Sequence, residues 1–292
     1  MVGVNNGIGR KTFLIINGVV MFLVCVVTLY PFLYIAAASL SDPVFISRGE
    51  IGIIPKGLNF RAYRMVANYP MIWRSYWNTI VYTVVGTFIN IFGTVFAAYP
   101  LSRKSFIARK FWNLFIFFPM LFHAGLIPQF VLVNGLNMRD TIWALVIPGA
   151  ISSYYVIIMR TFFDAIPSAL EESARIDGAS HFTILLRIIL PLSLPSLVTV
   201  GMFYAVGHWN SFFSAMMYLN DQSKLPLQIM LRNLVIQNQT DIVVDSTADD
   251  RAIVGEAVKY ATIIAATLPI LVVYPFIQKY FVQGVMIGSV KG

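Results

Sequence analysis

Charged side chains are scarce in this sequence of 292 residues, since they make up 12% of it while hydrophobic residues make up 58%. An ordinary soluble domain has about a quarter of its residues charged, and it needs them to cover its core with a polar surface. A bilayer tolerates the opposite composition, because lipid surrounds apolar side chains without cost. The composition therefore predicts a membrane protein.

Several kinds of chemical site are also missing. Cys25 is the one cysteine, so an internal disulfide and a multi-cysteine metal site are both excluded. The three histidines lie far apart, and the sequence has no H-E-x-x-H, no G-x-S-x-G and no carboxylate pair inside an apolar run. The phosphate-binding motif G-x-x-x-x-G-K-[ST] is absent as well. We expect no enzyme activity and no cofactor on this chain.

The apolar residues gather in six charge-free runs, each long enough for a helix that crosses a bilayer, which takes about 17–25 residues. The barrel pattern of about ten alternating residues does not occur. We predict an all-α polytopic membrane protein with six transmembrane helices in a single domain, residues 1–292. The predicted spans are Phe13–Ala38, Trp77–Leu101, Phe111–Met138, Thr141–Met159, Ile188–Asn220 and Ala261–Gln278.

The first apolar run could be a signal peptide or a permanent span. It extends over residues 13–38 without a charge, whereas the apolar core of a signal peptide has about 7–15 residues. We therefore expect an uncleaved first span, placed before the core of the domain at about residues 75–285.

Basic residues predict the orientation of the spans. The short gap Ser102–Lys110 has four basic residues and no acidic one, and cytoplasmic loops are enriched in lysine and arginine. This gap, the gap between the fourth and fifth spans, and both termini are predicted to be cytoplasmic. The longer outer loop Ser39–Tyr76 is also basic, and the rule has less force there. Because basic residues lie between apolar runs, the net charge of +8 suits anionic lipid headgroups, and we expect no nucleic-acid partner.

Two further segments leave alternatives open. The acidic outer segment Asp221–Tyr260 is either a solvated loop or a rim that touches a soluble delivery protein. The second span has small and short polar residues at helical spacing, which permit close helix approach within the chain or with a partner subunit. These residues are Gly86, Asn90, Gly93, Thr94 and Ala97.

The gap between the fourth and fifth spans has the signals of a short helix, a turn and a second helix. Pro167 suits a first helical turn, and Glu171 and Glu172 lie near its positive end. Gly178 can adopt the left-handed conformation that closes a helix, and Ser180 can cap the next one. We predict a rigid amphipathic segment at the cytoplasmic surface, followed by a bend at prolines 191 and 195.

This segment resembles the EAA loop of ABC-importer permeases, in which a coupling helix docks into a cleft of a cytoplasmic ATPase. The resemblance rests on Glu172-Ser173-Ala174, Asp177-Gly178-Ala179 and Leu190-Pro191, where Ser173 replaces the usual alanine. It implies that the ATPase-coupling residues are Glu171, Glu172, Ser173, Ala174, Asp177, Gly178 and Ala179. The competing interpretation is a juxtamembrane helix without a partner.

The rest of the chain is similar to carbohydrate-type permeases of the maltose-transporter class, in a subgroup for complex oligosaccharides. The similar stretches include Tyr30-Pro31, Trp77-Asn78-Thr79, Ala98–Arg103, Gly207–Asn210 and Leu225–Gln228. The resemblance implies a permease subunit of a binding-protein-dependent importer of sugars or oligosaccharides in a bacterial inner membrane. It also implies its partners: a second, related permease, two ATPase subunits that hold ATP and Mg²⁺, and an extracytoplasmic solute-binding protein.

Polar residues at membrane depth usually face the protein interior, and sugars are bound by hydrogen bonds and aromatic faces. The candidates for the substrate pathway are Asn90, His123, Tyr204, His208, Trp209, Asn210 and Phe212. The aromatic residues could instead be ordinary packing residues, and the histidines could be satisfied interior ones.

Two other classes of function remain as alternatives. An ion-coupled secondary transporter should have acidic residues inside its spans and often an inverted repeat. A membrane-embedded enzyme should have convergent acids, bases or metal ligands. The sequence has none of these features.

Overall fold

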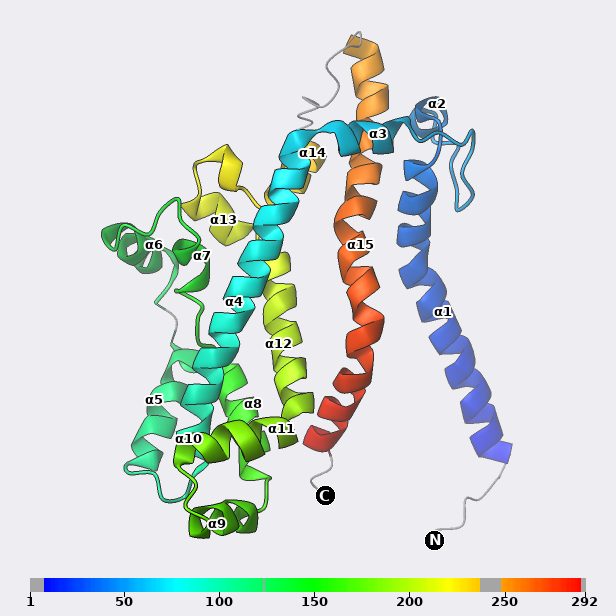
Figure 1. Ribbon diagram of the computed structural model, residues 1–292. Coiled ribbons are helices and arrows are strands. Elements are labelled where there is room, and N and C mark those ends of the chain that lie inside the picture. Colours follow the sequence, from blue (N-terminus) through cyan, green and yellow to red (C-terminus); the bar gives the residue numbers. More distant parts are fainter. Residues whose placement is uncertain (1–7, 123, 237–247, 290–292) are drawn as a thin grey trace. The chain divides into compact units, whose positions relative to one another are not determined.

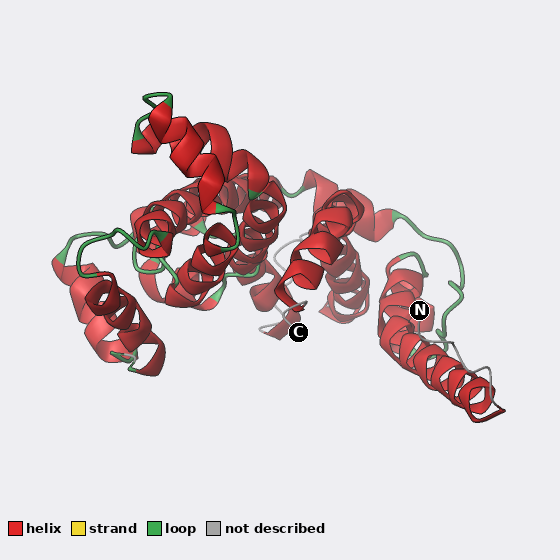
Figure 2. Ribbon diagram, turned by 90° about the horizontal axis from the view of Figure 1, so that it is seen from below, coloured by secondary structure: helices red, strands yellow, loops and turns green. Residues whose placement is uncertain are grey.

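The computed structural model describes residues 8–122, 124–236 and 248–289, and these residues form helices and loops without any strand (Figure 2). The predicted all-α fold is confirmed. The chain divides into two compact units, Met1–Pro70 with Leu231–Leu268, and Met71–Met230 with Pro269–Gly292. The single domain over the whole chain stays a prediction.

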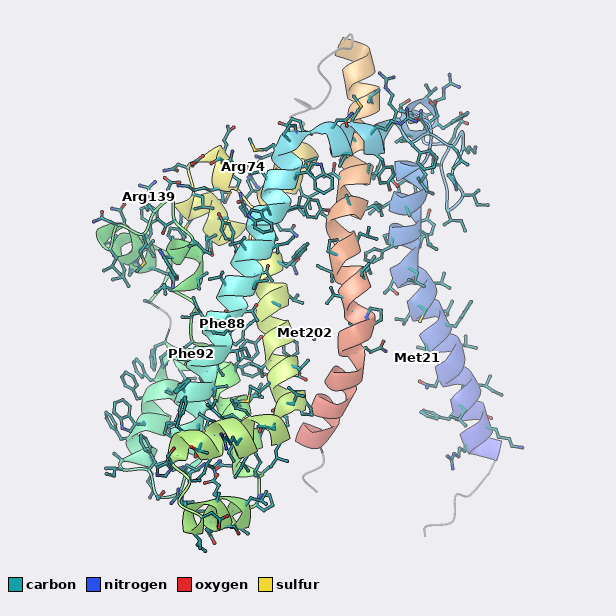
Figure 3. All side chains as sticks on the ribbon, viewed as in Figure 1. Met21, Arg74, Phe88, Phe92, Arg139 and Met202 are labelled. Atoms are coloured by element: carbon teal, nitrogen blue, oxygen red, sulfur yellow. The ribbon has the colours of Figure 1, made fainter. Side chains whose placement is uncertain are left out.

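The first unit contains α1 (Ile8–Ser39), α2 (Pro43–Ser47), α3 (Arg61–Asn68) and the first part of α15 (Ala248–Ser289). Most of α1 is exposed on every face, including Met21 (Figure 3). A helix that is apolar all round has lipid or another protein as its surroundings. Near its end α1 packs on α15, where the rings of Tyr34 and Tyr260 meet edge to face at 6.1 Å.

The second unit holds most of the other elements (Figure 1). Its core lies between α4, α8 and the segment from α10 to α12, and is built from apolar residues such as Val95, Phe163 and Ile189. The helices are α4 (Pro70–Ser102), α5 (Arg109–Leu121), α6 (Leu126–Gly135), α7 (Trp143–Val146), α8 (Ser153–Asp164), α9 (Ser168–Ile176), α10 (His181–Ile184), α11 (Leu190–Leu192), α12 (Leu194–Trp209) and α13 (Phe213–Tyr218). A π-helical turn, Leu185–Ile189, joins α10 to α11, a 3-10 turn covers Gln222–Lys224, and α14 (Leu227–Ile236) begins in this unit.

The predicted count of six spans is not confirmed. Three helices, α1, α4 and α15, are long and apolar enough to cross a membrane, and two bent pairs raise the number to five at most among the described residues. The pair α5 and α6 bends by 112°, and the pair formed by 181–192 and α12 bends by 83°. The fourth predicted span, Thr141–Met159, is not one helix, because it breaks between α7 and α8. Pro148, which lacks an N–H and disrupts a helix interior, lies in this break.

One face of α4 is a row of exposed aromatic rings. Phe88, Phe92 and Phe96 follow each other at a spacing of four residues, with ring centroids 6.4 and 4.4 Å apart. Figure 3 shows Phe88 and Phe92 on this helix. The opposite face of α4 is buried against the unit, so α4 has one face for the core and one for lipid or a partner.

Candidate functional site

Helix α9 begins after Pro167 and ends in a tight turn at Gly178. Pro167 is the N-cap and not a residue of the first turn. At the other end the Gly178 N–H donates to the carbonyl of Arg175 at 3.0 Å, and the Ala179 N–H donates to that of Ala174 at 2.9 Å. Gly178 has φ of +80°, which is strained for any residue with a Cβ. This bonding pattern is a Schellman motif, and the predicted left-handed turn is confirmed.

The second half of the predicted segment also forms, with a less regular helix than expected. The Ser180 hydroxyl accepts a hydrogen bond from the Thr183 N–H at 3.2 Å, which confirms the predicted N-cap. The helix then widens into the π-helical turn before it reaches Pro191. The predicted bend follows at Ser193, where the chain turns by 83° into α12.

The two adjacent glutamates of α9 face opposite ways. Glu171 has an exposed fraction of 5% and is the only buried residue of this helix, whereas Glu172 is exposed. The Glu171 carboxylate forms an ion pair with Arg103. Because Arg103 of the same chain pairs with this carboxylate, α9 presents Glu172 and not Glu171 on its exposed side, and the coupling role of Glu171 stays a prediction. Ser173, Asp177 and Gly178 are exposed like Glu172, while Ala174 and Ala179 lie half-buried against the core of the unit.

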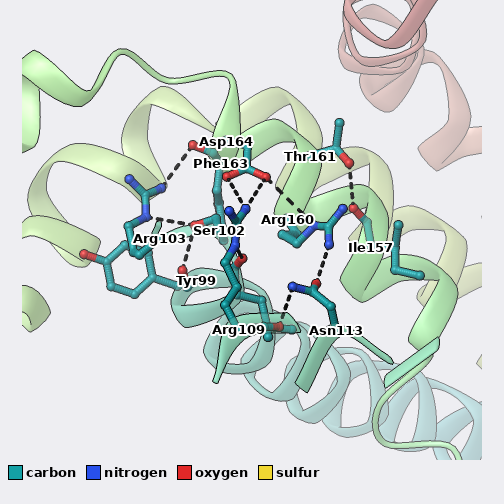
Figure 4. Close-up of polar contacts among 11 residues, drawn as sticks. Tyr99, Ser102, Arg103, Arg109, Asn113, Ile157, Arg160, Thr161, Phe163 and Asp164 are labelled. Carbon is teal, nitrogen blue, oxygen red and sulfur yellow. Dashed lines mark hydrogen bonds and ion pairs between the residues drawn. The ribbon is translucent and has the colours of Figure 1, made fainter. Parts of the chain in front are cut away.

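Arg103 is held by several groups at the end of α4 (Figure 4). Its Nη2 donates to the Phe163 carbonyl at 3.0 Å, and its Nε donates to the Ser102 hydroxyl at 2.8 Å. The guanidinium also lies over the Tyr99 ring, 5.1 Å from its centroid. Burial lowers the pKa of Arg103, but arginine remains charged in proteins. A charged donor here suits the buried carboxylate of Glu171.

A second arginine ties the same loop to the end of α8. Arg109 Nη2 donates to both carboxylate oxygens of Asp164 at 3.2 Å, and its Nε donates to the Leu101 carbonyl at 2.7 Å. Arg160 donates to the side-chain carbonyl of Asn113 on α5. We call the contacts of Arg103, Arg109, Asn113, Arg160, Asp164 and Glu171 the end network. The loop 102–110 and helix α9 therefore lie at the same end of the unit, as the predicted orientation requires.

Sequence reasoning missed the end network. It used the basic residues of loop 102–110 only as a sign of orientation. One signal was available, because two short gaps between predicted spans carry opposite charges. The gap 102–110 has four basic residues, and the gap between the fourth and fifth spans contains Asp164 and Glu171.

A different polar cluster lies inside the unit, where α4 meets α12. Asn90 is fully buried, with an exposed fraction of 0%. Its side-chain NH₂ donates to the carbonyls of Gly149 at 2.8 Å and Ala150 at 2.9 Å. Its carbonyl lies 2.6 Å from Nε2 of His208, so the proton between them belongs to the histidine. Asn90 thus joins α12 to the break between α7 and α8.

Tyr204 lies one turn before His208 in α12 and supports the same break. Its hydroxyl lies 2.8 Å from that of Thr94 and accepts a hydrogen bond from the Ser152 N–H at 3.1 Å. We call Asn90, Thr94, Tyr204 and His208 the interior brace. Together they bond three backbone groups that the broken helix leaves free, as membrane-embedded breaks require. The predicted pathway residues Asn90, Tyr204 and His208 hold helices together in this structure, and their place in the substrate pathway stays a prediction.

The small residues of the second span pack within the chain, as one of the two alternatives predicted. A Cβ added at Gly86 would lie 2.5 Å from Nε2 of His208, and one added at Gly93 would lie 2.8 Å from Ile151. Gly86 therefore makes room for the histidine of the interior brace.

The other predicted pathway residues cluster at the end of α12. The indole Nε1 of Trp209 is buried and finds no hydrogen-bond partner among the described residues, and Trp209 lines an apolar groove of about 210 Å³. Asn210 and Phe212 are exposed. His123 lies outside the described residues. The groove is lined by Thr83, Met202, Ala205, Val206, Trp209, Pro269, Ile270, Val273 and Tyr274.

The described part of the chain contains no group of three or more His, Cys, Asp or Glu side chains that could hold a metal ion. The arrangement offers bonded helices and a projecting helix.

Comparison with known proteins gives consistent matches over nearly the whole chain. Residues 89–287 match the family described as binding-protein-dependent transport system inner membrane component. Protein LplC of Bacillus subtilis is 42% identical over 91% of this chain and 90% of its own. The polygalacturonan/rhamnogalacturonan transport system permease protein YtcP of the same organism is 40% identical over 96% of this chain and 97% of its own.

A solved structure shows a similar fold. A chain of a bacterial ABC transporter involved in the import of the acidic polysaccharide alginate is 32% identical, with a TM-score of 0.87 over 94% of this chain and 98% of that one.

Proposed function

The chain belongs to the family of binding-protein-dependent transport system inner membrane components, and from this premise we propose that it forms half of the pore of an ATP-driven oligosaccharide importer. A second permease supplies the other half. Two cytoplasmic ATPase subunits hold ATP and Mg²⁺, and an extracytoplasmic solute-binding protein delivers the substrate. Both termini lie in the cytoplasm.

The observation that carries the proposal is the exposed side of α9. Ile176 has an exposed fraction of 87%, and Glu172 and Asp177 are exposed beside it. An apolar side chain flanked by carboxylates on a short, firmly capped helix suits insertion into a cleft that has an apolar floor and basic walls. α9 is therefore the coupling helix, and Glu172 pairs with a basic residue of the ATPase.

The cycle follows from this contact. ATP brings the two ATPase subunits together, each subunit carries its coupling helix along, and the pore changes from inward-open to outward-open. Substrate enters from the binding protein, and hydrolysis resets the pore. Trp209, Asn210 and Phe212 line the pathway, since an indole N–H that no described residue accepts and an exposed amide beside aromatic rings suit a sugar.

The substrate class is an acidic oligosaccharide. YtcP is named for polygalacturonan and rhamnogalacturonan, and the similar solved transporter for alginate, and these are uronate polymers. The net charge of +8 fits such a substrate. The described spans α1, α4 and α12 have no acidic residue that would repel a polyanion, and α15 has its three acidic residues within its first nine positions, at one end of the helix.

The test of coupling is Gly178→Pro. Proline cannot adopt φ of +80° and has no N–H for the Arg175 carbonyl, so the end of α9 unwinds. We expect uptake of trigalacturonate into proteoliposomes of the complete importer to be lost, while the chain still inserts in the membrane. ATPase subunits should no longer co-purify with it.

Gly49→Pro is the matched control. Gly49 also has a positive φ, +67°, and its N–H donates to the Ile46 carbonyl at 3.0 Å, but it lies in the predicted outer loop. This variant should retain the ATPase subunits. Normal uptake by Gly178→Pro would contradict the coupling role, and uptake of maltotriose in place of trigalacturonate would contradict the acidic substrate class.

A further inference from the structure

We propose that the ion pair between Arg103 and Glu171 is the mechanical connection through which the coupling helix moves α4. This inference rests on the proposed coupling role of α9, and it assigns the two adjacent glutamates of that helix to different tasks. Glu172 faces outward to the ATPase, and Glu171 faces inward to the spans. Arg103 and Glu171 are positioning residues, since neither touches substrate or ATP.

Helix α9 has few other attachments to its own unit. Of its nine residues only Glu171 is buried. Ala174, and Ala179 just beyond the helix, contact the core through a single methyl group each. On the exposed side, Arg175 Nη2 lies 3.5 Å from Nδ1 of His181 on α10, and such an exposed contact holds the helix weakly. A force on the exposed side of α9 would therefore tilt or slide this helix if Glu171 did not hold it.

Arg103 is a suitable anchor because it is fixed independently of Glu171. It follows α4 directly, its side chain is 13% exposed, and it bonds to the Phe163 carbonyl and the Ser102 hydroxyl. A planar guanidinium with several fixed donors is stiffer than a lysine side chain. A push on Glu171 therefore reaches the ends of both α4 and α8.

The interior brace continues this connection. Asn90 and Thr94 lie on α4, and their partners His208 and Tyr204 lie on α12. A displacement of α4 therefore acts on α12 and on the break between α7 and α8. The end of α12 carries Trp209, one of the proposed pathway residues.

The experiment measures whether α9 and α4 move as one body. In the complete importer with Cys25→Ser, spin labels are placed at Ser168 on α9, which is exposed and has no proposed contact with the ATPase, and at Val84 on α4, which is also exposed. Their separation is measured by pulsed electron resonance without nucleotide and after trapping with ATP and vanadate. With the ion pair intact, the separation should be the same in both states. In Glu171→Gln it should shift by several ångström on trapping, and transport per ATP hydrolysed should fall several-fold.

Asp164→Asn is the matched control. It makes the same carboxylate-to-amide change in the Arg109 pair, whose side chains are 29% and 35% exposed and which joins α5 to α8 without touching α9. This variant should keep the separation unchanged on trapping. An unchanged separation in Glu171→Gln, or an equal shift in Asp164→Asn, overturns the proposal.

Arg103→Lys serves if Glu171→Gln fails to assemble. Arg103 reaches Glu171, the Phe163 carbonyl and Ser102 through three different nitrogens, whereas lysine has its donors on one atom. The same shift is therefore expected at smaller size, and its absence also overturns the proposal. Co-purification separates the two levels of inference. If the unaltered chain retains no ATPase, the coupling role of α9 fails; if it retains the ATPase and the separation never responds, only the Arg103–Glu171 connection fails.

Discussion

The side chains that join α4 to α12 are neutral, whereas those that join the end of α4 to α8 and α9 are charged. The interior brace uses an amide, two hydroxyls and a histidine, and the end network uses three arginines, two carboxylates and the amide of Asn113. An ionised group costs several kcal/mol in the middle of a bilayer, roughly 3 kcal/mol on translocon-insertion scales. Neutral groups therefore hold the membrane-embedded part, and ion pairs hold the part near the water.

The two clusters also fix different parts of the fold. The interior brace satisfies backbone groups at one particular break, so it fixes where the irregular segment lies. The end network fixes the attachment of α9, and its partners come from four different segments. Because α4 carries residues of the interior brace and leads directly into Arg103, the two clusters lie one after the other along the same helix.

The largest expected effect is that of Arg103→Ala, which leaves the Glu171 carboxylate buried and unpaired. Removing one partner of a buried ion pair costs about 3–5 kcal/mol of unfolding free energy. Denaturation of the purified chain in mixed detergent and SDS measures this loss. The exposed neighbour Lys104→Ala is the control and should change the unfolding free energy by less than about 0.5 kcal/mol. Equal losses in the two variants would mean that the end network does not stabilise the unit.

A smaller loss is expected from Asn90→Leu, which removes three hydrogen bonds of the interior brace. Interhelical hydrogen bonds in membranes contribute about 0.6 kcal/mol on average and up to about 1.7. The expected loss is therefore roughly 2–4 kcal/mol in the same denaturation assay. Asn134→Leu changes an exposed asparagine of α6 and should lose nothing. A stable Asn90→Leu chain would instead favour the pathway role that the sequence predicted for this residue.

The features that the sequence predicts well depend on residues close together in the chain. The Gly178 turn and the Ser180 cap follow from local backbone rules, and both are present. The packing face of the second span also follows from spacing alone. The partners of Asn90 could not be predicted in this way, because the carbonyls of Gly149 and Ala150 belong to a helix break 59 and 60 residues away.

The break itself shows where the hydropathy pattern misleads. Thr141–Met159 is apolar throughout, so it qualifies as a span by composition, but hydropathy does not register the missing N–H of Pro148 or the interruption that follows. Likewise, charge counting places Arg103 and Glu171 in cytoplasmic gaps without pairing them. Only the folded chain brings the end of α4 to the buried side of α9.

The smallest expected effect sharpens the comparison, because it tests the space that the interior brace needs. Gly86→Ala places a Cβ 2.5 Å from Nε2 of His208, so the ring must move and its bond to Asn90 lengthens. Overpacking of this kind costs about 1–3 kcal/mol. Gly207→Ala is the control on α12, where a new Cβ meets nothing within 4 Å and alanine favours the helix by about 1 kcal/mol. The two substitutions should therefore change the melting temperature in detergent in opposite directions. Adding His208→Ala to Gly86→Ala should remove the clash, so the double variant should be more stable than the sum of the single losses predicts. Strict additivity would show that a Cβ at position 86 does not clash with the His208 ring.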